Sequence, residues 1–576
     1  MASTVEMGEA VDRQRPRLPD DVLHHMLSFD ILQQEDFLAC RLVCRDMTHV
    51  ATSFVFRHVR LEAIRVMDGH FMKIALSPRL RDHVREATCD TWVGGRFVDH
   101  VYHPYLLLTR FAKHLPCLRF FRNLHTLHLR FSPHCAKPGR STSTYALEES
   151  TVFRYSVLDT VFRCLDGTWS AKEQQKIDSD LRIYGGILTS DYHVPDDDAF
   201  VDGPIPIHTL TIANLADYND TRLTNSTAFQ NVINSGNLRD LKLLIATGRN
   251  ITVTDPTIHY RDWQNMYESL PKTWLSPGLA QHLRVLSLYG AGYWGWHPKM
   301  DFRLVNPTGE SGSGFPNLKV LALGKYVFSH EWQIDWIANL GKNNRNGGLE
   351  ELYLDNCPIL ACAAHPPPMD TLTTNLGLDA DGKEIIISNH GYPRPEAEVH
   401  DYQVPGETDH AFCLRWCDIL TRWQDTMPSL KVFKADKESW TIEKTDHATP
   451  MYGIRPEREL LAHRRNHNEF RTYNCPSPPE ERALAEKYMG GCVTLWLMFR
   501  TPLVTHPEFP LHYVKFDREL NSSALLGLSR YSPVCDLQVV SRATRELDMQ
   551  VCTLFLANLG HRVKWSSLVS FWFDDD

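Results

Sequence analysis

Apolar positions in residues 17–54 recur at helical spacing and predict three short amphipathic helices. The first stripe runs from Val22 to Leu27, after Pro19 and an acidic pair that suit the first turn of a helix. Further apolar stripes follow Glu35. About forty residues cannot bury all of these side chains among themselves. The surplus apolar face is therefore expected to bind a partner.

This segment resembles the F-box. The resemblance rests on LPDDVL at 18–23, MLSF at 26–29 and DFLACRLVCRD at 36–46. In F-box proteins this element binds the Skp-type adaptor of a cullin-RING ubiquitin ligase, so the resemblance implies that adaptor, and through it a cullin, as partners. The alternative is an ordinary helical subdomain that packs on its own protein. By resemblance, the adaptor contacts are Leu18, Pro19, Leu23, Leu27, Phe37, Leu42, Val43, Cys44 and Met47.

Two features depart from the F-box pattern. Met47 stands where the family usually has Trp, and the link between Phe29 and Asp36 is longer than usual. Both departures keep the apolar face, and each is expected to lower the affinity for the adaptor.

A recurring L-x-x-L-x-L pattern follows, which is the strand signature of leucine-rich repeats. Weaker copies begin at Ile207 and Leu430, and the copy at Leu349 continues to Cys357 and Leu360. In that longer form the Cys usually satisfies backbone groups in the turn after the strand. The full copies begin at Leu124, Leu238, Leu283, Leu318 and Leu349.

Amphipathic stripes before these strands predict helices, with Ser226 as a cap and Gly236 and Gly341 as end points. The predicted fold class is therefore α/β, with a three-helix N-terminal F-box followed by an irregular leucine-rich-repeat-like solenoid with a parallel sheet and outer helices. The helical stripes lie in 152–165, 229–233, 332–340 and 412–423. Because the strand spacing is irregular, insertions are expected at 166–206, 289–316 and 361–405.

Side chains alternate along a strand, so the residues between the leucines are expected to form a substrate-binding face of mixed charge. Tyr289 and Tyr353 would be its aromatic anchors. The loop 293–296, Tyr-Trp-Gly-Trp, either adds an anchor or covers the edge of the solenoid. The candidate substrate-binding residues are His128, Arg130, Asp240, Lys242, Tyr289, Glu351, Tyr353 and Asp355.

Composition narrows the function further. The 576 residues are 43% hydrophobic with a net charge of -9, which gives no basic field to gather nucleic acid. Residues 1–16 lack the apolar core of a signal peptide, and the longest apolar stretch, 493–499, is far too short to span a membrane. The 14 cysteines are scattered, which suits buried thiols in a reducing compartment. We expect a cytoplasmic or nuclear protein without nucleic-acid or membrane partners.

No catalytic or metal constellation stands out, so neither an enzyme nor a metal or other cofactor is expected. The pairs Cys40 with Cys44 and Cys413 with Cys417 lack the further ligands of a structural zinc site and are interpreted as buried thiols. Asp381 with Gly382 predicts a hairpin turn before a strand.

The predicted function is the substrate-receptor subunit of a cullin-RING ubiquitin ligase, which brings an unknown protein substrate to the enzyme by proximity. The layout is similar to the large F-box families of filamentous fungi. The alternatives are a leucine-rich-repeat scaffold outside ubiquitination and an enzyme with its site in the last segment. The expected domains are a disordered 1–16, an F-box at 17–57, a helical linker at 58–120, a substrate-binding array at 121–440 and a cap of uncertain structure at 441–576.

Overall fold

The computed structural model describes most of the chain between the N-terminal helices and the last helix. The described residues are 18–28, 32, 34–63, 69–91, 103–131, 135–136, 149–180, 203–246, 257–307, 314–364, 369–378, 381–394, 409–436, 511–517, 531–533 and 539–559. Residues 1–16, the apolar stretch 493–499 and most of 441–576 lie outside the described residues. The predictions made for these segments are therefore not tested.

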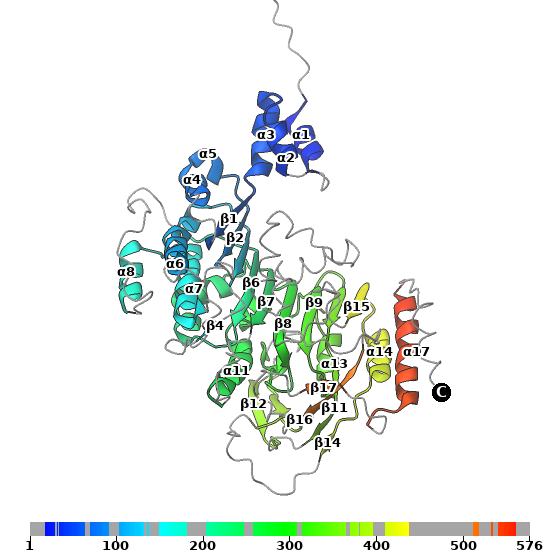
Figure 1. Cartoon of the computed structure of the whole chain (residues 1–576). Coiled ribbons are helices and arrows are strands. Elements are labelled where there is room, and N and C mark those ends of the chain that lie inside the picture. Colours follow the sequence, from blue (N-terminus) through cyan, green and yellow to red (C-terminus); the bar gives the residue numbers. More distant parts are fainter. Residues whose placement is uncertain are drawn as a thin grey trace, which may run out of the picture.

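A nine-stranded sheet, in which every neighbouring pair is parallel, dominates the mixed α/β structure (Figure 1). The strands follow one another in chain order, which confirms the predicted α/β class with a parallel sheet. They are β1 (His58–Glu62), β2 (Glu86–Asp90), β3 (Thr126–Arg130), β6 (Thr209–Ala216), β7 (Asp240–Ala246), β8 (Val285–Trp294), β9 (Val320–Tyr326), β10 (Glu351–Asp355) and β15 (Val432–Asp436).

All seven copies of the leucine pattern form strands of this sheet, in one register. The second apolar position of each copy pairs with its equivalents in the neighbouring strands, and all of these side chains are buried. This row consists of Leu127, Leu210, Leu241, Leu286, Leu321, Leu352 and Phe433. Because a shift of one residue would turn every leucine to the opposite face, the apolar pattern itself fixes the register.

Helices contribute to the same continuous core as the leucines. The predicted cap is confirmed, since Ser226 Oγ accepts a hydrogen bond from Phe229 N at 3.3 Å. Gly236 and Gly341 have φ angles of 72° and 70°, as expected where helices end. The four predicted stripes are α7 (Thr151–Asp166), α10 (Thr227–Asn234), α13 (Glu331–Ala338) and α14 (Trp416–Thr426).

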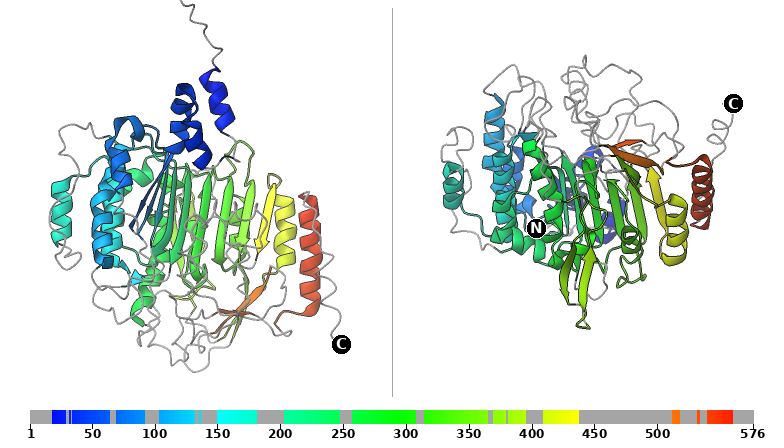
Figure 2. Two further views of the ribbon diagram at one scale, coloured as in Figure 1. Left: turned by 45° about the horizontal axis from the view of Figure 1, so that its top comes forward. Right: turned by 90° about the horizontal axis from the view of Figure 1, so that it is seen from below.

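In the chain, the remaining helices occur before β1, between successive strands and after the last strand. Figure 2 shows the last helix, in red, beside α14, in yellow, at one edge of the sheet. Three of the remaining helices are 3-10 helices: η3 (Leu115–Phe120), η6 (Leu270–Lys272) and η7 (Phe302–Leu304). The others are α1 (Asp20–Leu27), α2 (Gln34–Cys40), α3 (Arg45–Val55), α4 (His70–Leu76), α5 (Pro78–Arg81), α6 (His103–His114), α8 (Ala171–Asp180), α9 (Thr221–Thr224), α11 (Thr257–Ser269), α12 (Pro277–Ala280) and α17 (Arg542–Asn558).

The prediction of a helical linker over 58–120 is wrong in part. The segment contains helices, but it also holds β1 and β2, which pair in register with β3 and extend the sheet toward the N-terminus. Val59 and Leu61 in β1 and Ala87 and Cys89 in β2 occupy the leucine positions and are buried. Neither strand has a full leucine triplet, so the pattern did not reveal them.

Smaller sheets lie beside the large one. β11 (Ile359–Ala364), β14 (His410–Ala411), β16 (Tyr513–Asp517) and β17 (Tyr531–Pro533) form a four-stranded sheet. β12 (Thr373–Leu378) and β13 (Glu384–Ser388) form an antiparallel hairpin, which confirms the turn predicted at Asp381 and Gly382. The short strands β4 (Cys135–Ala136) and β5 (Glu149–Ser150) pair with each other.

Candidate functional site

The three N-terminal helices stand together at one end of the molecule and have a small core of their own (Figure 1). Leu23 and Leu27 of α1 are buried in that core with two residues of α3. The ring of Phe37 in α2 stacks on Phe54 in α3, with ring centroids 5.2 Å apart. This core is separate from the one beneath the large sheet.

A second apolar stripe, on α1 and just before it, is exposed. Val22 and Met26 of α1 and Leu18, two residues before the helix, follow one another at steps of four and are 39%, 49% and 53% accessible. Residues four apart lie on one face of a helix, one turn above the other. The core positions Leu23 and Leu27 are offset by one residue, so α1 carries apolar side chains on its inner face and along its exposed stripe.

The end of α2 and the turn after it expose three more apolar side chains. Leu38, Leu42 and Val43 are 44%, 88% and 67% accessible. The turn is held by Thr48 Oγ1, which donates to the backbone oxygen of Arg41. We use the name apolar N-terminal surface for the six exposed apolar side chains of this helical unit, Leu18, Val22, Met26, Leu38, Leu42 and Val43.

The predicted adaptor contacts divide between this surface and the small core. Leu18, Pro19, Leu42, Val43 and Cys44 are exposed. Phe37 and Met47 are partly buried and pack against the small core.

Leu23 and Leu27 are buried, so their prediction as adaptor contacts is wrong: they hold α1 to α3 instead. The sequence interpretation missed Val22, Met26 and Leu38 as exposed positions. The i, i+4 spacing of Leu18, Val22 and Met26 was the available signal for the outer stripe.

The predicted substrate-binding face is partly accessible. His128, Arg130, Asp240, Lys242 and Glu351 are partly exposed between the leucines.

At the first strands this face carries a polar cluster. His128 Nε2 lies 3.3 Å from Glu86 Oε1, and His58 Nε2 lies 2.8 Å from Thr88 Oγ1. The hydrogen bond from His128 lowers the pKa of Glu86 to about 2, whereas burial lowers the pKa of His58 to about 4. His58 and Glu86 were missed because β1 and β2 were missed.

Tyr289, Tyr353 and Asp355 are buried, so their prediction as substrate contacts is wrong. Gly324 of β9 pairs with Tyr289 of β8, and a Cβ atom on Gly324 would lie 2.0 Å from Cδ1 of that ring. The missing side chain therefore makes room for Tyr289 to lie against the sheet. Tyr353 donates its hydroxyl to Glu351 Oε2 at 2.8 Å.

The aromatic loop after Tyr289 is also part of the interior. Trp294 and Trp296 are buried, and their indole N–H groups donate to the backbone oxygens of Gly324 and Gly391, both at 2.7 Å. Of the two interpretations of 293–296, burial at the sheet edge is the one that agrees with the structure.

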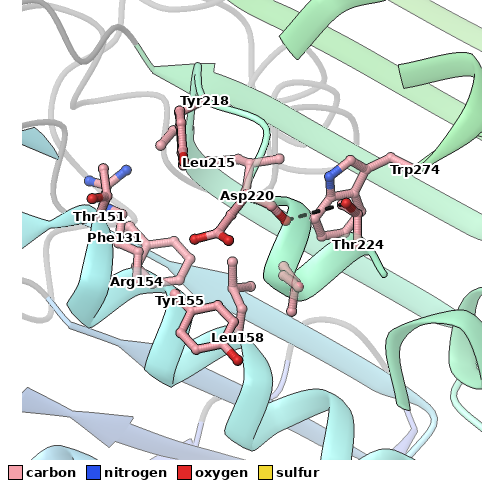
Figure 3. Close-up of a pocket in the computed structure, with 12 residues that line it drawn as sticks. Phe131, Thr151, Arg154, Tyr155, Leu158, Leu215, Tyr218, Asp220, Thr224 and Trp274 are labelled. Carbon is pink, nitrogen blue, oxygen red and sulfur yellow. Dashed lines mark hydrogen bonds between the residues drawn. The ribbon is translucent and has the colours of Figure 1, made fainter. Parts of the chain in front are cut away.

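A small crevice opens beside α7 and α9, near the carboxyl ends of β3 and β6 (Figure 3). Arg154 lies at this site, but its Nε donates to Glu149 Oε2 at 2.9 Å and its Nη1 donates to Asn214 O at 2.6 Å. Since Asp220 also pairs with Arg222, the crevice offers an essentially apolar wall. That wall comprises Phe131, Tyr155, Leu158, Leu215, Tyr218, Leu223 and Trp274.

The titratable groups of the described residues form no group of three His, Cys, Asp or Glu that could hold a metal ion. The prediction of buried thiols is confirmed for Cys417, but Cys44 and Cys413 are exposed and Cys40 is partly exposed. Cys357 is buried, and its Sγ donates to Leu323 O at 3.2 Å, as the longer repeat form implies. No helix in the described part of the chain is long and apolar enough to cross a membrane.

Comparisons with known proteins add no relative. No family model matches the chain, and no curated protein matches it. The functional interpretation therefore depends on the residues and their geometry.

Proposed function

We propose that this protein is the substrate-receptor subunit of a cullin-RING ubiquitin ligase, with an F-box at the N-terminal helices and a leucine-rich-repeat-like array behind it. The observation that carries the proposal is the apolar N-terminal surface. Six large apolar side chains are exposed between Leu18 and Val43, on a helical unit that has its own core. Such a concentration of exposed apolar side chains marks a protein–protein interface.

The apolar N-terminal surface lies on elements that are ordered before any partner binds. Leu42 and Val43 lie in a turn that the Thr48 hydroxyl fixes, and Val22 and Met26 lie on the regular helix α1. Because these elements are already ordered, binding would cost little additional conformational entropy. In this proposal the partner is the Skp-type adaptor, which links the chain to a cullin.

The sheet would supply the second half of the function. Its partly exposed polar positions, from His128 on β3 to Glu351 on β10, would contact the target protein. Holding the target next to a ubiquitin-loaded enzyme raises the effective concentration of its lysines, so the receptor needs no catalytic groups of its own.

The test is co-purification of the full chain with a recombinant Skp-type adaptor. Changing Leu42→Ala and Val43→Ala together removes the two most exposed side chains of the surface and is expected to abolish capture. The matched control is Leu372→Ala, because Leu372 is 70% exposed but lies beside the β12–β13 hairpin. That control is expected to bind like the intact chain.

Two results would count against the proposal. An intact chain that does not capture the adaptor would leave the scaffold alternative, since the sheet could then bind partners without joining a ligase. Equal loss in the double variant and in the Leu372→Ala control would mean that capture is nonspecific adhesion to apolar side chains.

A further inference from the structure

One end of the large sheet carries an unbroken ladder of charged or histidine residues. The residue immediately before each of the nine strands has an ionisable side chain, and eight of the nine are basic. We call each of these nine residues a rung. From Arg85 onward, the backbone N–H of each rung donates to the carbonyl oxygen of the rung before it at 2.7–2.8 Å. The basic ridge, as we call it, consists of Arg57, Arg85, His125, His208, Arg239, Arg284, Lys319 and Lys431.

The two lysines at one end of this ridge pair with the same carboxylate. Glu350, the eighth of the nine residues in strand order, accepts from Lys319 Nζ at 2.9 Å and from Lys431 Nζ at 2.8 Å. The guanidinium of Arg85 donates to the backbone oxygen of Asp82 at 2.7 Å, and that of Arg239 donates to a backbone oxygen at 3.3 Å.

The four arginines of the ridge form no ion pair with a carboxylate in the part of the chain that the structure describes. Their positive charge acts on their neighbours. Burial, His208, Arg85 and Arg57 all lower the pKa of His125, whose ring centroid lies 5.0 Å from that of His208.

This concentration of positive charge contrasts with the rest of the protein. The chain as a whole has a net charge of -9. At the opposite end of the sheet, four strands finish on an acid: Glu62, Asp90, Asp355 and Asp436. Basic residues therefore precede eight of the nine strands at the end of the sheet that follows α3, although Glu86, Asp240 and Glu351 also begin strands at that end.

The spacing of the ridge selects the shape of its partner. Neighbouring strands lie about 4.8 Å apart, so the rungs repeat at that distance. Three residues of an α-helix rise about 4.5 Å, whereas side chains on one face of an extended chain repeat at about 6.7 Å. A helix with acids alternately three and four positions apart presents a carboxylate about every 5 Å, which is closer to the strand spacing than an extended chain can come. The six rungs from Arg57 to Arg284 span about 24 Å, the length of about 16 helical residues.

We propose that the basic ridge binds an acidic α-helix of a partner protein, with the helix axis laid across the ends of the strands. Arginine favours such a partner because its guanidinium forms charge-assisted hydrogen bonds with carboxylates. The first rung, Arg57, lies two residues after α3 ends, so the bound helix would lie on the side of the sheet next to α1–α3 (Figure 2). This surface goes beyond the adaptor and target surfaces proposed above and does not depend on them.

The test measures binding of a fluorescent helical peptide of 16 residues with glutamates along one face. The full chain is expected to bind it more tightly than a peptide of equal composition whose glutamates are spread around the helix. The variant changes Arg57→Gln and Arg284→Gln, because both side chains are exposed and neither guanidinium donates a hydrogen bond to the described residues. The backbone hydrogen bonds of both residues are kept, so folding is expected to be unaffected. Affinity is expected to fall about tenfold in that variant.

A control variant, Lys172→Gln with Lys272→Gln, removes the same charge from two exposed lysines outside the ridge. It is expected to bind within about twofold of the intact chain. If both double variants lose affinity equally, or if the two peptides bind equally, the attraction is general and the proposal fails. Tighter binding of a DNA duplex than of the peptide at physiological salt would assign the ridge to phosphates and would also overturn it. Arg239→Gln provides a second ridge variant if the first unfolds.

Discussion

The three N-terminal helices and the nine-stranded sheet bury very different shares of their apolar side chains. In the sheet, the row from Leu127 to Phe433 is completely enclosed, with helices packed against it. In the helices, Leu23 and Leu27 are buried while Leu42 of the same unit is 88% exposed. A large parallel sheet can satisfy its leucines internally, whereas a small helical unit has too little interior for its own. The exposed leucines of the helices are thus the ones available to a partner.

The largest effect is expected beside the large sheet, at the buried ion pair of Glu149 in β5 and Arg154 in α7. Glu149→Ala would leave the Arg154 guanidinium buried beside α7 without its carboxylate, and breaking such a pair costs about 3–5 kcal/mol. Denaturant unfolding measures the loss. Glu173→Ala is the control, because Glu173 pairs with Arg163 but is 52% exposed, and its removal is expected to cost under about 1 kcal/mol.

Leucine truncations compare the two cores directly. Leu286→Ala removes a fully buried side chain from the middle of the sheet and is expected to cost about 2–5 kcal/mol of global stability. Leu27→Ala removes a buried side chain from the small core and is expected to open α1–α3 while the sheet stays folded. Hydrogen exchange separates the two outcomes: global loss of protection in the Leu27→Ala variant would show that the helices and the sheet unfold as one unit.

The contrast also explains how much the sequence could predict. Seven strands follow from the five full and two weaker copies of the leucine pattern, because local pattern and tertiary packing agree there. The sequence pattern did not predict β1 and β2, because smaller side chains such as Ala87 occupy their leucine positions. Burial of Tyr289 depends on Gly324, a residue of another strand, so no local pattern could reveal it. On α1, periodicity marked the apolar positions, but which stripe faces α3 is decided by the packing of the three helices.

Acidification is expected to weaken the sheet region through two histidines. Burial lowers the pKa values of His58 and His330 to about 4, while the unfolded value is 6.5. Between these values the unfolded chain binds protons that the folded chain does not, so stability falls as the pH drops from 6.5 to 4 and then levels off. Each histidine contributes at most about 3 kcal/mol. Unfolding midpoints across this range should depend less on pH in His58→Gln and His330→Gln variants, and an unchanged slope would contradict the prediction.

The last helix is attached by a contact between distant segments. Asp548 of α17 accepts from Cys417 N at 2.8 Å, at the start of α14, and from the Tyr513 hydroxyl at 2.7 Å. Asp548→Ala would leave both donors without this acceptor and is expected to cost about 1–3 kcal/mol. Asp548→Asn retains one acceptor oxygen and is expected to cost less. Limited proteolysis and unfolding curves measure the change, and equal stability of all three proteins would exclude this carboxylate as the attachment of α17.

The smallest effect on stability is expected where the effect on binding is expected to be largest. Leu42→Ala with Val43→Ala changes side chains that are mostly in solvent, so the free energy of unfolding should change by less than about 0.5 kcal/mol. Leu23→Ala, on the inner face of α1, should destabilise the same three helices far more. If the double variant instead lost as much stability as Leu23→Ala, Leu42 and Val43 would already be packed against this chain. The apolar N-terminal surface would then be an interior contact, and the helices would satisfy their apolar side chains as the sheet does.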